Sequence, residues 1–335
     1  MNKFVSWLVK PIEDALKPEE TKIKEETIVE IENEQKTYRP QTFKEYVGQK
    51  RAKELVENYI IAIKKRQVIF PHTLISGKAG MGKTTLVKII ANYLGVSFYE
   101  TIGSEAKDFD ALREIIMNNP RGIIFIDEIH ALPRDFVEKL YPLMEDFCFE
   151  GQQYPQFTLM GATTELGELL KDRRPFYDRF KLILELEGYN EKDLIKITTQ
   201  YKNKVFPEDI IKLKTHRKIA KNSREIPRNA IRLLEATIYL EDILKVLKSF
   251  SIIQEGYTYK DLQVLKYVAL NKSGVGLEGL SNYLGTSKEN YIYQIEPYLL
   301  KNNLVIRTPR GRKITQEGLN MIKKLENEIK KGGKK

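Results

Sequence analysis

The sequence predicts an α/β protein: a parallel-sheet core, then a small helical domain, then a C-terminal domain with a basic β-hairpin. Three observations support this fold class. Short apolar runs alternate with stretches of helical period between residues 37 and 188. The strand pattern then stops, and residues 189–250 keep only the helical period. From residue 251, short helices precede a tight arginine-rich turn. Strands that alternate with helices favour a parallel sheet.

Each expected strand of the core is a short apolar run, and the runs are 72–76, 96–101, 122–126, 157–162 and 181–186. The run 122–126 is apolar without interruption, as expected when both faces of a sheet are covered. Residues 83–94 place their apolar side chains on one helical face, which predicts a helix after the first strand. Pro227 predicts a break between helices in the segment 189–250.

The C-terminal domain, residues 251–322, ends in two short β-like runs, 303–307 and 313–315, around a turn at 309–312. Helices followed by such a hairpin predict a winged helix. Residues 251–335 carry 15 Lys or Arg against 8 Asp or Glu, within a chain of net charge +10. A basic end is what a phosphate-binding surface requires. We expect residues 323–335 to form a basic tail and residues 1–36, with 9 acidic and 6 lysine side chains, to form a charged N-terminal extension.

Composition excludes several classes of protein. Cys148 is the single cysteine, which excludes a disulfide framework and a cysteine zinc site. Its isolation favours a reducing compartment, so the expected location is cytoplasmic. No run approaches the roughly 20 apolar residues of a membrane span, so no membrane partner is expected.

Residues 77–84, GKAGMGKT, fit the phosphate-binding pattern G-x-x-x-x-G-K-[ST]. Glycines in such a loop let backbone N–H groups turn inward around phosphates, and the helix that follows points its positive end at them. The sequence therefore predicts ATP as cofactor, with Lys83 on the β- and γ-phosphates and the Thr84 hydroxyl on Mg²⁺. The expected loop residues are Gly77, Gly80, Met81, Gly82, Lys83, Thr84 and Thr85.

A second chemical signal stands at the end of the apolar strand 122–126, where Asp127 and Glu128 follow directly. A carboxylate at the carboxyl end of a parallel strand projects into the ligand crevice. Asp127 fits a second Mg²⁺ ligand, and Glu128 fits the general base that activates the attacking water.

Further segments of the chain resemble one family, the RuvB Holliday-junction branch-migration helicases of the AAA+ class. The match runs from about residue 37 to 320, and its C-terminal segments are more specific than the ATP motifs. The segments are 38–40 (YRP), 45–49 (EYVGQ), 125–130 (FIDEIH), 140–146 (LYPLMED), 157–164 (FTLMGATT), 178–180 (DRF), 226–229 (IPRN), 296–300 (EPYLL) and 307–312 (RTPRGR).

The resemblance implies an AAA+ ATPase core, a helical lid and a winged-helix DNA-binding domain. It also implies a homo-oligomeric ring, a hexamer, that translocates duplex or branched DNA in recombination and repair. By position, Thr164 resembles sensor 1, Arg179 the arginine finger that reaches the neighbouring subunit's ATP, and Arg228 sensor 2. The residues that resemble walls of the adenine pocket are Tyr46, Val47, Tyr189 and Pro227, and those that resemble DNA-contacting residues of the wing are Arg307, Arg310 and Arg312.

The chain departs from the family in three places. One is in the phosphate loop, where Lys78 and Ala79 replace two prolines and should leave nucleotide binding intact. Family members carry a long β-hairpin that docks on RuvA, whereas here only residues 147–156 separate the LYPLMED and FTLMGATT segments. That short connection argues against docking on a RuvA-type partner. The segment 171–177 is longer than usual, so Arg173 or Arg174 competes with Arg179 for the role of finger.

Two other functions remain open at this stage. A clamp-loader-like AAA+ protein shares the phosphate loop but usually ends in a helical collar, which residues 256–320 do not resemble. An ATP-switched DNA-binding scaffold is the other alternative, and it is opposed by the presence of the residues an active ATPase needs, Lys83, Asp127, Glu128 and Arg179.

Overall fold

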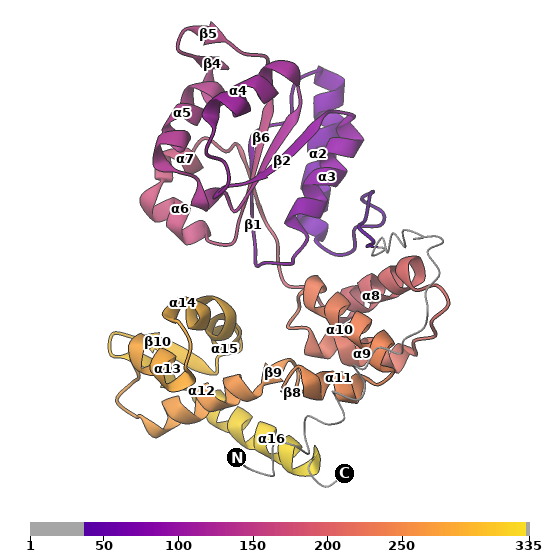
Figure 1. Ribbon diagram of the computed structural model, residues 1–335, viewed down its shortest axis with the longest axis vertical. Helices are drawn as coiled ribbons and strands as arrows, with labels where there is room; N and C mark the ends of the chain where they lie inside the picture. The colour runs from indigo at the N-terminus through magenta and orange to yellow at the C-terminus, as the bar shows by residue number, and fades with distance from the viewer. Residues whose placement is uncertain (1–36, 333–335) are drawn as a thin grey trace, which may run out of the picture. The chain divides into compact units, whose positions relative to one another are not determined.

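The computed structural model describes residues 37–332 (Figure 1), and the expected N-terminal extension, residues 1–36, lies outside them. The first part of the described chain contains a five-stranded parallel sheet of order β2-β3-β6-β1-β7. Its strands are β1 (Thr73–Ser76), β2 (Phe98–Ile102), β3 (Ile123–Asp127), β6 (Thr158–Thr163) and β7 (Leu182–Glu185). This confirms the α/β fold class, with β2 starting two residues later than its apolar run.

Helices cover both faces of the sheet because its central strands are apolar on both sides (Figure 1). Along β3, Phe125 packs toward α2 and α3, whereas Ile124 and Ile126 pack toward α4 and α5. Such alternation is the two-residue period of a strand. The helices and short turns of this domain are α2 (Lys50–Arg66), α3 (Lys83–Leu94), α4 (Phe109–Asn118), the 3-10 turn η1 (Ile129–Ala131), α5 (Arg134–Glu145), α6 (Leu166–Asp172) and α7 (Arg174–Tyr177).

Between α5 and β6 the chain forms a small hairpin of β4 (Cys148–Phe149) and β5 (Gln152–Gln153). Each strand has two residues, and Gly151 takes a positive φ of 76° in the turn. The connection therefore has the minimal size that the sequence predicted.

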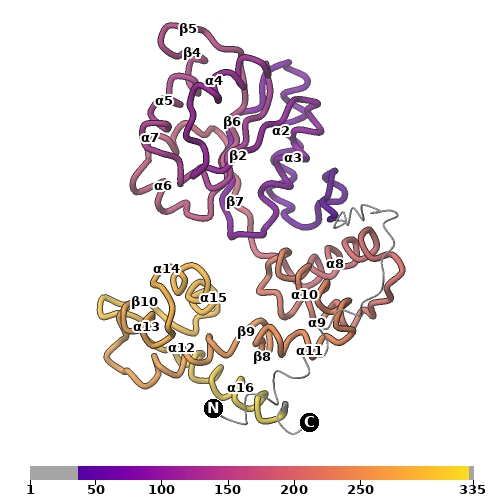
Figure 2. The backbone as a smooth tube through the Cα atoms, in the orientation of Figure 1, coloured from indigo at the N-terminus to yellow at the C-terminus, as the bar shows by residue number. Residues whose placement is uncertain are grey.

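After β7 the chain enters a helical domain, as the backbone trace shows (Figure 2). Its helices are α8 (Glu191–Val205), α9 (Leu213–Asn222), α10 (Pro227–Leu240) and α11 (Ile243–Ser249). Helix α10 begins with Pro227 at its first position, where the missing N–H costs nothing and φ is already helical. The predicted break at this proline is thus the start of a helix.

The C-terminal domain is a winged helix with its own apolar core around Leu265, Tyr291 and Leu299. Its elements are β8 (Ile252–Gln254), β9 (Tyr257–Thr258), α12 (Tyr259–Leu270), α13 (Leu277–Leu284), α14 (Lys288–Asn290), η2 (Tyr291–Ile295), α15 (Glu296–Lys301), β10 (Val305–Thr308), β11 (Gly311–Ile314) and α16 (Gln316–Gly332). Helix α16 crosses the expected boundary at residue 322, so much of the expected basic tail is helical. Lys334 and Lys335 lie outside the described residues.

The hairpin β10–β11, hereafter the wing, is narrower than its sequence predicted. Only Pro309 and Arg310 occupy the turn, and Arg312 belongs to β11, directly across from Arg307. Both arginines pair with the Glu296 carboxylate, which is fully buried: Arg312 Nε donates at 2.7 Å and Arg307 Nη2 at 2.6 Å. Burial raises the pKa of Glu296, but the two guanidinium groups outweigh it, so the net pKa is lowered. The wing is therefore fastened to α15 by a shared carboxylate.

Within the described part of the chain, no helix combines the length and apolarity that crossing a membrane requires.

Replacing Glu296 with Gln removes the charge that the two arginines share while keeping the size of the side chain. We expect the free energy of unfolding at pH 7 to fall by about 1–3 kcal/mol. Because the folded-state pKa is lowered, the ionised carboxylate stabilises the fold fully above the ordinary pKa of 4.5 and loses that effect as the pH falls through the lowered value. In urea unfolding, the gap between wild type and variant should shrink below pH 4.5. A gap independent of pH, or an equal one for the exposed Glu317→Gln, would contradict this.

Candidate nucleotide-binding site

The loop between β1 and α3 has the backbone conformation that its glycines predict. Gly77, Gly80 and Gly82 have φ values of 151°, 79° and 94°, which L side chains rarely adopt. Lys83 starts helix α3 and is buried, and its ammonium donates to the Gly77 carbonyl at 2.8 Å. Burial lowers the pKa of Lys83, while the charges of Glu128 and Asp127 oppose that shift. The loop thus forms a compact cradle with one cation at its centre.

The first turn of helix α10 approaches this loop closely. The Arg228 N–H donates to the Gly80 carbonyl at 3.4 Å. A Cβ atom on Gly80 would lie 2.6 Å from the Cβ of Arg228, which is closer than real atoms approach. Glycine at position 80 therefore permits the contact between the phosphate loop and the helical domain.

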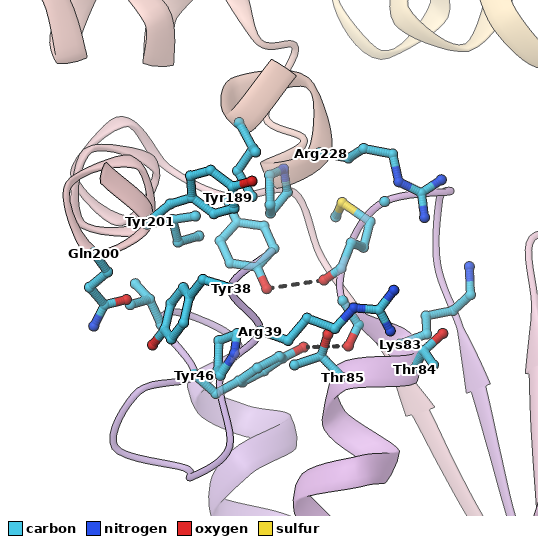
Figure 3. A pocket seen from close by; sticks show the side chains of 18 of the residues that line it. Tyr38, Arg39, Tyr46, Lys83, Thr84, Thr85, Tyr189, Gln200, Tyr201 and Arg228 are labelled. Atoms are coloured by element: carbon cyan, nitrogen blue, oxygen red, sulfur yellow. Dashed lines mark hydrogen bonds between the residues drawn. The ribbon is translucent and has the colours of Figure 1, made fainter. Parts of the chain in front are cut away.

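Two tyrosines join the loop to the start of the core and to the start of the helical domain (Figure 3). The Tyr46 hydroxyl donates to the Gly82 carbonyl at 3.2 Å, and the Tyr189 hydroxyl donates to the Met81 carbonyl at 3.1 Å. Both side chains are buried, and burial raises the pKa of both hydroxyls, so they stay neutral donors at pH 7.

A pocket of about 420 Å³ lies between these elements, and most of the nucleotide-site residues expected from the sequence line it (Figure 3). They are Tyr46, Val47, Gly80, Met81, Gly82, Lys83, Thr84, Thr85, Asp127, Glu128, Tyr189, Pro227 and Arg228. Such a volume suits a cofactor-sized ligand. Sequence reasoning missed other lining residues, among them Tyr38, Arg39, Gln200, Tyr201 and Arg232.

The carboxylates after β3 face the start of α3. The Thr84 hydroxyl donates to Asp127 Oδ2 at 3.4 Å, which places a hydroxyl and a carboxylate oxygen side by side. Glu128 has a left-handed φ of 47°, and its Oε2 accepts from Thr164 Oγ1 at 3.0 Å and from Thr164 N at 3.3 Å. Strands β3 and β6 thereby bring Glu128 and Thr164 together. The sequence alone predicts that each residue follows a strand, but not that the two residues are in contact.

Arg179 is not among the residues that line the pocket. Its guanidinium pairs with Glu145 Oε1 at 3.0 Å, donates to the Pro175 carbonyl at 2.6 Å and lies 3.9 Å above the ring of Tyr141. Of the two competing arginines, Arg173 donates to the Leu132 carbonyl at 2.7 Å, whereas Arg174 is exposed. A role for any of them at ATP requires a neighbouring subunit.

On the wing, the three expected arginines differ. Arg312 is largely buried against Glu296, Arg307 is half exposed, and Arg310 stands exposed in the turn. Arg310 is therefore the wing arginine with the freest access to a polyanion.

A parallel sheet with this strand order, a phosphate loop directly after β1, a helical lid and a winged helix define an AAA+ P-loop ATPase. Comparison with family models matches residues 38–186 to the Holliday junction DNA helicase RuvB P-loop domain and residues 254–323 to the RuvB C-terminal winged helix domain.

Individual relatives agree with these matches. The RuvB subunit of the Holliday junction branch migration complex from Lactobacillus delbrueckii is 35% identical over 310 residues, covering 85% of this chain and 91% of the relative. Its counterpart from Ehrlichia canis is 36% identical, with 85% and 93% covered. The solved RuvB branch migration motor of Thermotoga maritima superposes with a TM-score of 0.74 at 33% identity, covering 85% and 98%. The chain belongs to the RuvB family.

Gly80→Ala tests the contact between the loop and the lid, and Gly151→Ala is a matched control. Both glycines have nearly the same positive φ, 79° and 76°, so both substitutions carry the same backbone strain of about 1–2 kcal/mol. Only the Cβ at position 80 meets another residue; around Gly151 there is open space. We expect Gly80→Ala to weaken binding of a fluorescent ATP analogue by about tenfold or more, or about 1.4 kcal/mol. Equal affinities in the two variants would show that the close approach is dispensable.

Proposed function

We propose that this protein is an ATP-driven motor that translocates duplex DNA and drives branch migration of Holliday junctions in recombination and repair. One observation carries the proposal: a chain with a winged helix brings the phosphate loop, the strand-end carboxylates and a lid arginine to a single pocket. Because its substrate is DNA, we expect the protein to work in the cytoplasm. The winged helix also favours a motor over a clamp loader, which usually ends in a helical collar.

We infer one orientation for ATP in this pocket. The loop residues 77–85 receive the phosphates, because the backbone N–H groups of the loop and of the first turn of α3 favour anions. The adenine then lies toward Tyr46, Val47, Tyr189 and Pro227, all of which line the same pocket. Arg228 lies in the first turn of α10 beside the loop and is placed to contact the γ-phosphate.

Mg²⁺ fits the pair formed by Thr84 and Asp127, a hydroxyl and a carboxylate oxygen 3.4 Å apart. Magnesium is usually held by one or two protein oxygens together with substrate phosphates. When bound, the ion neutralises charge on the β- and γ-phosphates.

Hydrolysis is assigned to Glu128 and Thr164. The Glu128 carboxylate accepts a proton from the attacking water, and the Thr164 hydroxyl, 3.0 Å from that carboxylate, keeps it oriented. Phosphoryl transfer depends mainly on positioning and on stabilising charge. Lys83 and Arg228 stabilise the charge of the phosphates, and Glu128 and Thr164 position the attacking water.

Arg179 is assigned to the neighbouring subunit's ATP. Its contacts with Tyr141 and Glu145 hold it away from its own pocket. An arginine finger supplied in trans contributes about 10³–10⁵ in rate, and it makes hydrolysis depend on assembly. An arginine finger supplied by a neighbour requires a homo-oligomer, and we propose a hexameric ring, as the resemblance to the RuvB helicases implies. The two-residue strands of the β4–β5 hairpin support a motor that does not dock on a RuvA-type partner.

The decisive experiment is dissociation of a synthetic four-way junction by the purified protein alone. We expect ATP-dependent dissociation, and ATP turnover stimulated by duplex or four-way-junction DNA. Glu128→Gln should abolish both while leaving nucleotide binding intact, because it removes the base and not the phosphate loop. Turnover that is indifferent to DNA and stimulated only by a sliding clamp would favour the clamp-loader alternative instead.

Arg310→Ala tests the wing. Phosphate contacts are independent of sequence, and each one removed lowers the salt dependence of binding. We expect weaker binding to several unrelated duplexes by the same factor, with a slope of log K against log salt smaller by about 1. Lys272→Ala, another solvent-accessible cation of the same domain but outside the wing, is the control. A loss confined to one sequence would indicate base recognition and contradict a translocase.

A further inference from the structure

One histidine beside the catalytic carboxylate has no role in the function proposed so far. His130 lies on η1, directly after β3, and its side chain is mostly buried. Its Nδ1 is 3.0 Å from Thr163 Oγ1 and 3.4 Å from Glu128 Oε2. The sequence placed His130 in the FIDEIH segment, but a lone histidine in a short turn gave no sign of these contacts.

One oxygen of the Glu128 carboxylate, Oε2, lies close to polar groups of both Thr164 and His130. Oε2 accepts from the hydroxyl and the backbone N–H of Thr164, and His130 Nδ1 approaches the same atom. The Glu128 side chain is one-third exposed, so without such partners it would sample other rotamers in water. A misplacement of about 1 Å at a reacting group costs about 100-fold in rate.

The other side of the imidazole faces a second carboxylate. His130 Nε2 is 3.8 Å from Glu165 Oε1. Glu165 is itself fixed, because its backbone N–H donates to Thr163 Oγ1 at 2.9 Å and its Oε2 accepts from the Tyr293 hydroxyl at 3.4 Å. The imidazole therefore sits between two carboxylates, with Thr163 as a shared anchor.

We propose that His130 is a positioning residue for ATP hydrolysis, which holds the Glu128 carboxylate beside Thr164 and is itself oriented by Glu165. The inference rests on the proposed function, since it concerns the hydrolytic step. His130 does not line the nucleotide pocket, whereas Glu128 does, so the histidine acts through the glutamate and does not touch the substrate. Residues that orient the ligands of metal sites are typically worth about 10- to 100-fold in activity, and we expect a comparable effect for a residue that orients a general base.

The two ring nitrogens can be tested separately. Asparagine places its amide nitrogen where Nδ1 lies, and glutamine reaches toward the position of Nε2. We expect His130→Ala to lower kcat for ATP by about 10- to 100-fold, with KM and nucleotide affinity changed by less than about threefold. His130→Asn should recover most of the lost kcat, and His130→Gln should not. His216→Asn is the matched control, because His216 contacts Thr198 through Nδ1 in the lid and neither residue lines the nucleotide pocket.

Glu165→Gln tests the second half of the arrangement. It should lower kcat by a smaller factor, and it should have no further effect in the His130→Ala background, because both residues act through one contact. A kcat of His130→Ala within about twofold of the wild type would overturn the proposal, as would losses that multiply in the double variant. If His130→Ala fails to fold, the proposal is tested by His130→Asn, which should keep most of the wild-type kcat, and by Glu165→Gln, which should lower it. A wild-type protein without any turnover would contradict the proposed function as well, whereas an active wild type with an unaffected His130→Ala would contradict only this inference.

Discussion

The site depends on one geometric constraint: parallel strands end at the same edge of a sheet. Because β1, β6 and β3 are neighbours, the residues that follow them emerge side by side. Lys83 and Thr84 come from the start of α3, after the loop that follows β1, Asp127 and Glu128 from the end of β3, and Thr164 from the end of β6. A shift of β3 by a single residue would turn its side chains, Asp127 included, toward the opposite face of the sheet. The close packing of the buried side chains on both faces opposes such a shift.

Most of this edge could be predicted from the sequence, because its signals are local. The apolar run 122–126 and the glycine spacing of residues 77–84 each fix a strand end within a few residues. Neither signal reports which strands are neighbours, so the hydrogen bond between Thr164 and Glu128 was not visible. For the same reason the sequence does not reveal the contacts of His130, because Thr163 and Glu165 come from β6 and the residues just after it.

Other features could not be predicted from the sequence, because they depend on contacts between residues that are distant in the chain. The position of Arg179 in a motif suggests a role for it, but does not reveal its contacts with the ring of Tyr141 and the carboxylate of Glu145, which belong to α5. The shared carboxylate of Glu296 was equally hidden, since only the antiparallel register sets Arg307 across from Arg312. Helix α16 continues to Gly332 although its lysines resembled those of a solvated tail, because Leu325 and Ile329 pack on the winged-helix core.

The pairing of Glu296 with two wing arginines affects how long the protein stays bound to one position on DNA. A motor that advances along a duplex must detach from each phosphate as often as it attaches. By pairing with Arg307 and Arg312, Glu296 neutralises part of the positive charge at the base of the wing, while Arg310 stays exposed in the turn. Partial neutralisation of a basic hairpin favours brief contacts with a polyanion over prolonged residence, and brief contacts are what continuous movement requires.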